Sequence, residues 1–366
     1  MLRRRFISLG VVPLAAMLGA CSPAAKTSQA PASSGAAKKP VTFAEIAAYQ
    51  GADRQQMLEE GAKQEGTLTW YTTIAGDVLD AEIKAFEQKY PYVKVQLFRT
   101  DTVPLQTKLI EEAKSKKYVA DVTETGQDQA LVLRDELKVL QPWFSPIIKT
   151  RQPSGLSPTG DGMTYWILDS ESYVGFAYNT NAIPESAVPK TWKDILNPAL
   201  KGKMQVSGTS TGVTWTGNLI SNQGEAFVQQ VAKQQDIKVQ QISGKALNDL
   251  VASGEVAASP AIYRDHAQQS MEKGAPVKWV PLDPVTTGPY AVAVVNAFPH
   301  PHAGMLFADF LASEDGGKIM SNYHYGSSAN EAGFVRWRAA EGLSATQYEQ
   351  KFNQWQDTFQ KLFVQK

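Results

Sequence analysis

Short apolar strands alternate with amphipathic helices along most of this chain, and this alternation constrains the fold more than any other feature. Residues 68–72 form an apolar, β-branched and aromatic run. Residues 79–90 repeat apolar side chains at the spacing of one helical face, and residues 93–97 alternate apolar with polar as in a half-buried strand. Strand–helix–strand units of this kind predict a mostly parallel sheet flanked by helices.

The same alternation continues to the C-terminus and supports two α/β lobes. Further strands are predicted at residues 119–122, 164–178, 203–206, 237–240, 256–258, 277–280 and 290–295. Further helices are predicted at residues 103–113, 129–137, 212–220, 245–253, 264–273, 302–311 and 347–362. Within residues 164–178, the polar segment Asp169 to Ser172 predicts a break in the strand.

The N-terminus has the pattern of an export signal. Arg3, Arg4 and Arg5 precede an apolar stretch at residues 6–20, which is shorter than the roughly 20 residues that a spanning helix needs. Small residues then lead into Cys21, the chain's one cysteine, as at a signal-peptide cleavage site. This junction resembles the bacterial lipobox, which predicts cleavage after residue 20 and a lipid on the Cys21 thiol. The arginines suit either Sec or twin-arginine export.

Residues 21–40 predict a lipidated, flexible tether. Ala, Ser, Pro and Lys dominate this segment, which therefore buries too little apolar surface to offset the entropy of ordering. No later apolar run approaches 18 residues, so no other membrane span is expected. The protein is accordingly predicted to lie in the periplasm or on the cell surface, anchored by its lipid.

Charge and cysteine content exclude several classes of function. Removal of residues 1–20 takes away three arginines and no acidic residue, which leaves 33 basic and 36 acidic side chains. Such a chain lacks the basic surface expected of a nucleic-acid-binding protein. With Cys21 acylated no thiol remains, which excludes disulfides, zinc–thiolate sites and a cysteine nucleophile.

Three segments carry a family resemblance. Residues 86–95 (FEQKYPYVKV), residues 189–203 (PKTWKDILNPALKGK) and residues 303–316 (AGMLFADFLASEDG), together with Tyr178-Asn179-Thr180, occur in the expected order. They are similar to motifs of the periplasmic-type solute-binding proteins of ABC importers, in the class II subgroup labelled ferric-iron or thiamine/polyamine-like. The resemblance spans residues 66 to about 320.

The resemblance implies a two-lobed fold whose cleft closes on a small solute. It assigns residues 41–177 and 285–366, C-terminal helices included, to lobe I and residues 178–284 to lobe II. It also implies a monomer that delivers its solute to a permease and ATPase complex, with no cofactor. The alternatives are a ferric-iron receptor of the same family and a sensory lipoprotein that signals ligand occupancy to a membrane partner.

Loops at the carboxyl ends of predicted strands supply the candidate ligand residues, because open α/β sheets bind ligands there. These candidates are Thr72, Thr73, Glu124, Thr125, Ser207, Thr209, Ser210, Thr211, Gly212, Ser259, Tyr263 and Arg264. Thr286 and Thr287 precede the return strand and are expected in the cleft or the hinge.

The 207–212 loop is the strongest anion candidate, because it runs directly into a predicted helix. The start of a helix offers unpaired N–H groups and a partial positive charge; the alternative is ordinary N-capping by Ser210 or Thr211. Arg264 suits a carboxylate or phosphate but would repel a ferric ion. A small oxyanion, such as an organophosphate, phosphonate or carboxylate, is therefore favoured over iron.

Metal binding and catalysis have weak support in the sequence. Tyr263, Tyr323 and His324 are the weak metal candidates, and His300 and His302 precede a predicted helix. No H-E-x-x-H motif is present. Residues 208–212 (GTSTG) contain the letters of G-x-S-x-G, but none of the four histidines has a carboxylate or serine partner evident from its spacing. The protein is predicted not to be an enzyme.

Overall fold

A computed structural model describes residues 40–74, 76–327 and 333–365. The predicted signal peptide, Cys21 and the tether up to residue 39 lie outside these residues. Within the described part of the chain, no helix is both long and apolar enough to cross a membrane.

A parallel βαβαβ unit begins the folded body. Strand β1 (Thr67–Thr72) lies between β2 (Lys94–Arg99) and β3 (Val122–Gly126) and is parallel to both. Helices α3 (Val78–Lys89) and α4 (Thr102–Ser115) connect these strands. The predicted strand–helix alternation is confirmed here, and the apolar side of α3 ends at the residue before Pro91, where proline stops a helix.

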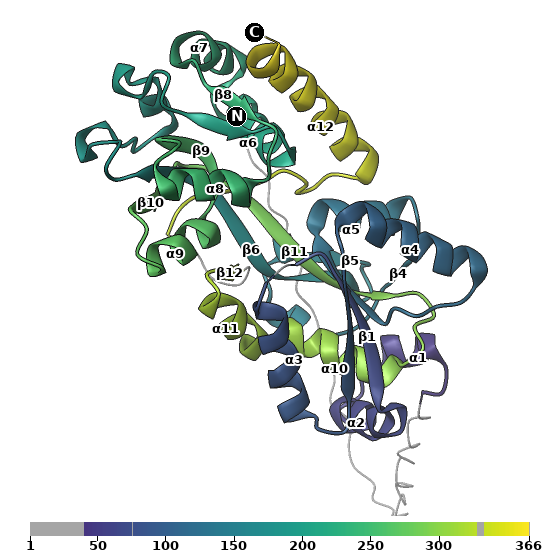
Figure 1. Cartoon of the computed structure of the whole chain (residues 1–366). Helices are drawn as coiled ribbons and strands as arrows, with labels where there is room; N and C mark the ends of the chain where they lie inside the picture. The colour runs from purple at the N-terminus through teal and green to yellow at the C-terminus, as the bar shows by residue number, and fades with distance from the viewer. Residues whose placement is uncertain (1–39, 75, 328–332, 366) are drawn as a thin grey trace, which may run out of the picture. The chain divides into compact units, whose positions relative to one another are not determined.

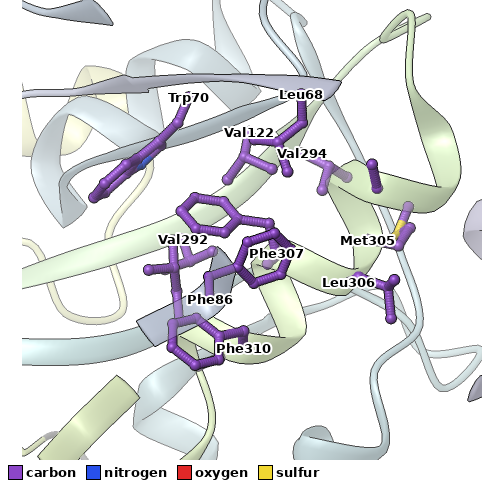
Figure 2. Packing of buried hydrophobic residues seen from close by; sticks show 14 of the residues in the cluster. Leu68, Trp70, Phe86, Val122, Val292, Val294, Met305, Leu306, Phe307 and Phe310 are labelled. Atoms are coloured by element: carbon purple, nitrogen blue, oxygen red, sulfur yellow. The ribbon is translucent and has the colours of Figure 1, made fainter. Parts of the chain in front are cut away.

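Lobe I is built on this unit, and a cluster of aromatic side chains lies in its core among aliphatic ones (Figure 2). The ring centroids of Trp70 and Phe86 lie 5.1 and 4.9 Å from that of Phe307 on α10 (Pro301–Leu311). All three side chains are fully buried. Burial of such a side chain contributes about 1.5–3 kcal/mol, so α10 is fixed firmly against the sheet.

Lobe II has its own sheet elements and its own core. Its strands are β7 (Gln205–Ser207), β8 (Lys238–Gln240), β9 (Ala258–Tyr263) and β10 (Val277–Val280). Its helices are α6 (Ser210–Gln223), α7 (Glu225–Gln235), α8 (Gly244–Ser253) and α9 (Arg264–Glu272). Trp192 and Trp215 are buried at its centre.

Two long antiparallel strands, β6 (Thr164–Asn179) and β11 (Val285–Val295), run side by side between the lobes (Figure 1). Ile167 on β6 belongs to the core of lobe I and Phe176 to that of lobe II. Because β9, β10 and β11 pair antiparallel with β6, the main sheet is mixed, where the sequence predicted mostly parallel sheets.

The predicted break at Asp169 to Ser172 is wrong, because β6 runs through these residues without interruption. The polar side chains are buried, and the charged Glu171 has partners supplied from elsewhere in the chain. The Glu171 carboxylate accepts a hydrogen bond from Nε of Arg338 at 2.9 Å, and Arg336 also lies beside it, 3.4 Å from Nε to Oε2. A buried charge is tolerated only with such pairing, which sequence periodicity does not reveal.

The remaining helices and strands complete the two lobes. The helices are α1 (Phe43–Ala48), α2 (Arg54–Glu65), α5 (Gln127–Asp135), α11 (Glu314–Asn322) and α12 (Ala345–Phe359). The short strands are β4 (Leu140–Gln141), β5 (Leu156–Pro158), β12 (Gly326–Ser327) and β13 (Arg336–Arg338). Short helical turns lie at η1 (Pro146–Thr150), η2 (Pro153–Gly155), η3 (Glu185–Ala187), η4 (Trp192–Leu196), η5 (Pro198–Leu200) and η6 (Gln360–Val364).

One expectation about the C-terminal third is confirmed and one requires correction. The helix predicted at residues 302–311 is α10 (Pro301–Leu311), and Ser313 caps the next helix, α11, by accepting from the N–H of Gly316. Helix α12, expected on lobe I, packs mainly on α6 of lobe II, and its Trp355 and Phe359 are buried in the core of that lobe.

Candidate functional site

One cavity of about 490 Å³ is lined by residues of both lobes and of the strands that join them. Lobe I contributes Thr73, Thr102 and Gly126 to Gln129; lobe II contributes Ser210, Thr211, Thr214 and Tyr263. The joining strands contribute Ser172, Val174 and Thr286 to Tyr290, and the C-terminal segment contributes Ala339, Ala340, Tyr348 and Phe352. Most of the lining side chains therefore carry a hydroxyl or amide group.

Four of the predicted ligand residues meet in this cavity: Thr73, Ser210, Thr211 and Tyr263. Thr286 and Thr287, expected in the cleft or the hinge, also line it. These six residues come from four separate segments of the chain, and the carboxyl ends of β1, β7 and β9 lead into three of those segments. The geometric rule for open α/β sheets thus locates the cavity.

The first turn of α6 has no side-chain cap. Ser207, at the end of β7, donates its hydroxyl hydrogen to the carbonyl of Ile242 at 2.6 Å and fixes the loop. Thr209 occupies the N-cap position, but its side chain makes no capping hydrogen bond to the helix. Ser210 and Thr211 follow and line the cavity. The unpaired N–H groups of this turn are thus available to a ligand.

Tyr263 adds a neutral hydroxyl beside that turn. Its Oη lies 3.5 Å from Oγ1 of Thr211. Burial raises the pKa of Tyr263 above its ordinary value, so the phenol keeps its proton at neutral pH. A protonated phenol and a threonine hydroxyl can both donate hydrogen bonds to an anion.

The start of α5 faces the same cavity with a different chemistry. Gly126 is its N-cap, and Asp128 lies in its first turn. Oδ2 of Asp128 accepts a hydrogen bond from Nε2 of Gln129 at 3.1 Å and one from the Tyr348 hydroxyl at 3.3 Å. Burial raises the pKa of the Asp128 carboxyl. Among the described residues that line the cavity, Asp128 is the charged one, and no lysine, arginine or histidine accompanies it.

Three of the predicted ligand residues lie in strands instead of loops: Thr72 ends β1, and Glu124 and Thr125 belong to β3, which extends to Gly126. Glu124 is fully buried. Burial and the nearby carboxylates of Asp169 and Glu82 raise the pKa of Glu124 well above its ordinary value. Thr72 accepts from the N–H of Ile74 at 3.1 Å. None of the three lines the cavity.

Four other predicted residues support the site without lining it. Ser207 and Thr209 hold the loop before α6, with 2.8 Å between their hydroxyl oxygens. Gly212 allows close packing, because a Cβ there would overlap the carbonyl oxygen of Ser207 and lie 3.0 Å from the Phe359 ring. Ser259 is buried within β9, which extends past the predicted end to Tyr263.

Arg264 has protein partners and does not line the cavity. Its guanidinium carbon lies 4.6 Å from the centre of the Tyr173 ring, and Nη2 donates to the carbonyl of His324 at 3.1 Å. The side chain therefore connects α9 to the segment after α11. Sequence patterns could not identify these partners, since both lie far from Arg264 along the chain.

The weak metal candidates do not assemble. Nε2 of His324 lies 2.9 Å from Oε1 of Glu272, His300 pairs with Asp121, and His302 pairs with Glu65. Tyr323 packs against the core of lobe I. Across the described residues, no group of three or more His, Cys, Asp or Glu side chains is placed to hold a metal ion.

Sequence reasoning missed Asp128, Tyr290 and Tyr348, all of which line the cavity. Asp128 lies two residues after Gly126, so a correctly placed end of β3 would have indicated it. Tyr290 lies at an irregularity in the pairing of β11 with β6, and Tyr348 comes from α12. No local pattern indicates either tyrosine.

Residues 81–333 match the family of bacterial extracellular solute-binding proteins. The chain belongs to this family. The predicted family and two-lobed class II fold are thereby confirmed. An uncharacterized protein of Haemophilus influenzae is 25% identical over 267 residues, which cover 70% of this chain and 76% of that protein.

Solved periplasmic binding proteins share the fold. AfuA of Actinobacillus pleuropneumoniae, with exogenous fructose-6-phosphate bound, matches with a TM-score of 0.63 and 20% identity over 82% of this chain and 100% of its own. Iron-bound HitA of Pseudomonas aeruginosa matches with a TM-score of 0.62 and 21% identity over 80% of this chain and 99% of its own. These identities establish a common fold, while the ligands differ between the two proteins.

Proposed function

We propose that this protein is the receptor of an ABC importer for a small organic oxyanion. The observation that carries the proposal is the open first turn of α6, whose residues Ser210 and Thr211 line the cavity without a side-chain cap. The helix dipole and the free N–H groups favour an anion there. The hydroxyls of Thr211 and Tyr263 supply further donors.

One of the two solved relatives has fructose-6-phosphate bound and the other has iron bound. The cavity lining favours the oxyanion: among the described residues it contains one carboxylate and no histidine. Ferric iron is a trivalent cation, and a single carboxylate beside neutral tyrosines compensates little of its charge. Ferric-iron binding therefore remains the second candidate and is included in the test below.

The proposed mechanism is capture by closure. Residues of both lobes line the cavity, and β6 and β11 are the strands that pass between the lobes, so we assign the hinge to these strands. A solute held by both lobes stabilises the closed form by its differential affinity for that form. The closed receptor then delivers the solute to a permease, and no bond in the solute is broken.

A thermal-shift experiment tests the proposal. The probes are fructose 6-phosphate, inorganic phosphate, citrate and ferric citrate. A bound oxyanion should raise Tm, because a ligand at one hundred times its Kd stabilises the folded state by about 2.7 kcal/mol. Stabilisation by ferric citrate alone, together with a visible tyrosinate-to-iron absorption band, would overturn the oxyanion assignment in favour of iron.

We further propose that Cys21 is the lipid attachment site and that residues 22–40 tether the receptor to a membrane. The support is the sequence of residues 18–21 and the family, which is extracellular. Replacement of Cys21 by serine should release the protein from the membrane fraction. Unchanged retention of the Cys21→Ser variant would contradict the anchor.

A further inference from the structure

The segment that follows α11 contains a histidine in a left-handed backbone conformation. His324 has a φ of 71° and directly follows Tyr323, the C-cap of the helix. The N–H of His324 donates to the carbonyl of Ser321 at 3.0 Å, and the N–H of Tyr325 donates to the carbonyl of Met320 at 3.1 Å. In this Schellman pattern the left-handed residue is usually glycine, which has no Cβ to crowd the backbone. The side chain of this histidine therefore needs an explanation beyond the end of the helix.

The imidazole of His324 reaches from lobe I to lobe II. Its neighbours in the chain, Tyr323 and Tyr325, pack against the core of lobe I. Nε2 of His324 lies 2.9 Å from Oε1 of Glu272, the last residue of α9. Helix α9 belongs to lobe II, where its Ala267 is buried with side chains of α8 and β9. A contact of this kind exists only while the lobes are together, because their separation moves the two partners apart.

Arg264, the first residue of α9, makes a second contact with the same histidine. Its Nη2 donates to the carbonyl of His324 at 3.1 Å, and its guanidinium carbon lies 4.6 Å from the centre of the Tyr173 ring on β6. Gly326 leaves room for that ring, since a Cβ there would overlap the Tyr173 hydroxyl. One helix of lobe II therefore holds both the side chain and the backbone of His324.

Both sides of this contact adjoin the cavity wall. Arg264 directly follows Tyr263, which lines the cavity. Tyr325 directly follows His324, and its ring centroid lies 6.1 Å from that of Tyr290, which also lines the cavity. The contact between the lobes is thus connected to the wall through lobe II on one side and through β11 on the other.

We propose that His324, held by Glu272 and Arg264, is an interlobe clasp that favours the closed form of the receptor. The clasp stabilises the arrangement in which both lobes line the cavity, so less of the solute's binding free energy is used to bring the lobes together. His324 is a positioning residue and does not line the cavity. The proposal rests on the proposed receptor function and adds the residues that set its closing equilibrium.

Small-angle scattering and thermal unfolding of the ligand-free protein are the first test. His324→Gly removes the imidazole and suits the left-handed backbone, so Tm should hold or rise slightly while the radius of gyration increases. Lys116→Gly is the matched control: Lys116 is exposed and ends α4 with a φ of 56°. This control should have the same effect on Tm and leave the radius of gyration unchanged.

Calorimetric titration measures the effect of the clasp on affinity. The probe is whichever of fructose 6-phosphate, inorganic phosphate, citrate and ferric citrate raises Tm most. His324→Gly and Glu272→Ala should each weaken its binding about 2- to 5-fold, since the two side chains are 23% and 60% exposed and such pairs contribute little. The double variant should bind no more weakly than His324→Gly alone, because Glu272 acts through His324.

The outcomes distinguish this inference from the proposed function. If no probe binds, the oxyanion function fails, and ligand-free scattering still decides the clasp. Equal radii of gyration for His324→Gly, Lys116→Gly and the unaltered protein would overturn the clasp. It would also be wrong if a probe binds with the same affinity to His324→Gly, Glu272→Ala and the unaltered protein, while the receptor function would stand.

Discussion

The starts of α5 and α6 face one cavity from opposite lobes, yet they differ in charge. Neither helix start has a side-chain cap. Helix α6 has only Ser210, Thr211 and Gly212 in its first turn, so its partial positive charge remains available. Helix α5 has Asp128 in its first turn, and that carboxylate offsets the same charge. The two helix starts therefore present opposite charge to the cavity, and the proposed function assigns the anion to the start of α6.

The largest expected effect comes from Gly212, which lets α12 and the β7–α6 loop approach the start of α6. Gly212→Ala should destabilise the protein by about 1–3 kcal/mol, the usual range for overpacking, because the new Cβ overlaps the Ser207 carbonyl. Tm should fall and oxyanion affinity should fall with it. Gly317→Ala is the control: it lies in α11 with open space around its Cβ position, and an unchanged or higher Tm is expected.

A smaller effect is expected when α6 is made to resemble α5. Ser210 is exposed in the first turn of α6, so Ser210→Asp adds a carboxylate without disturbing packing. Oxyanion affinity should fall at least about tenfold, or 1.4 kcal/mol, by charge repulsion. The free energy of unfolding should stay equal or rise by about 0.3–1 kcal/mol, as an acid at a helix N-terminus is favourable.

Titration calorimetry measures the oxyanion affinity of Ser210→Asp and Ser210→Asn, and thermal unfolding measures their stability. Asparagine has nearly the same shape as aspartate but carries no charge. Ser210→Asn should therefore bind oxyanions with nearly the affinity of the unaltered protein. Equal affinity in the aspartate and asparagine variants would show that the start of α6 does not bind the anion.

The smallest effect is expected from Thr211→Val, which keeps the shape and removes the hydroxyl that lies 3.5 Å from Oη of Tyr263. This long contact contributes little to stability, so Tm should change by a degree or two at most. Oxyanion affinity should fall about 2- to 5-fold, near the lower end of the range for one neutral hydrogen bond. A loss of Tm without a loss of affinity would assign Thr211 to capping alone.

Local sequence patterns predicted much of the fold because they depend on neighbouring residues. Helical spacing located α3 and α10, and strand alternation located β2. The predicted ends of two strands were less accurate. Strands β3 and β9 continue through polar residues such as Glu124 and Ser259, which are fully buried. A polar residue inside a strand resembles a loop residue until its tertiary partners are known.

The sequence by itself determined the α/β lobes, the family and the α6 side of the candidate site, since a strand, a hydroxyl-rich loop and a helix start follow one another within residues 205–212. Only the tertiary structure decided that Glu124 is buried beside other carboxylates, that Arg264 turns to protein partners and that Tyr348 of α12 meets Asp128. The physical reason is distance along the chain. Burial, ion pairing and long-range packing set the orientation of a side chain, and these depend on residues that no local pattern contains.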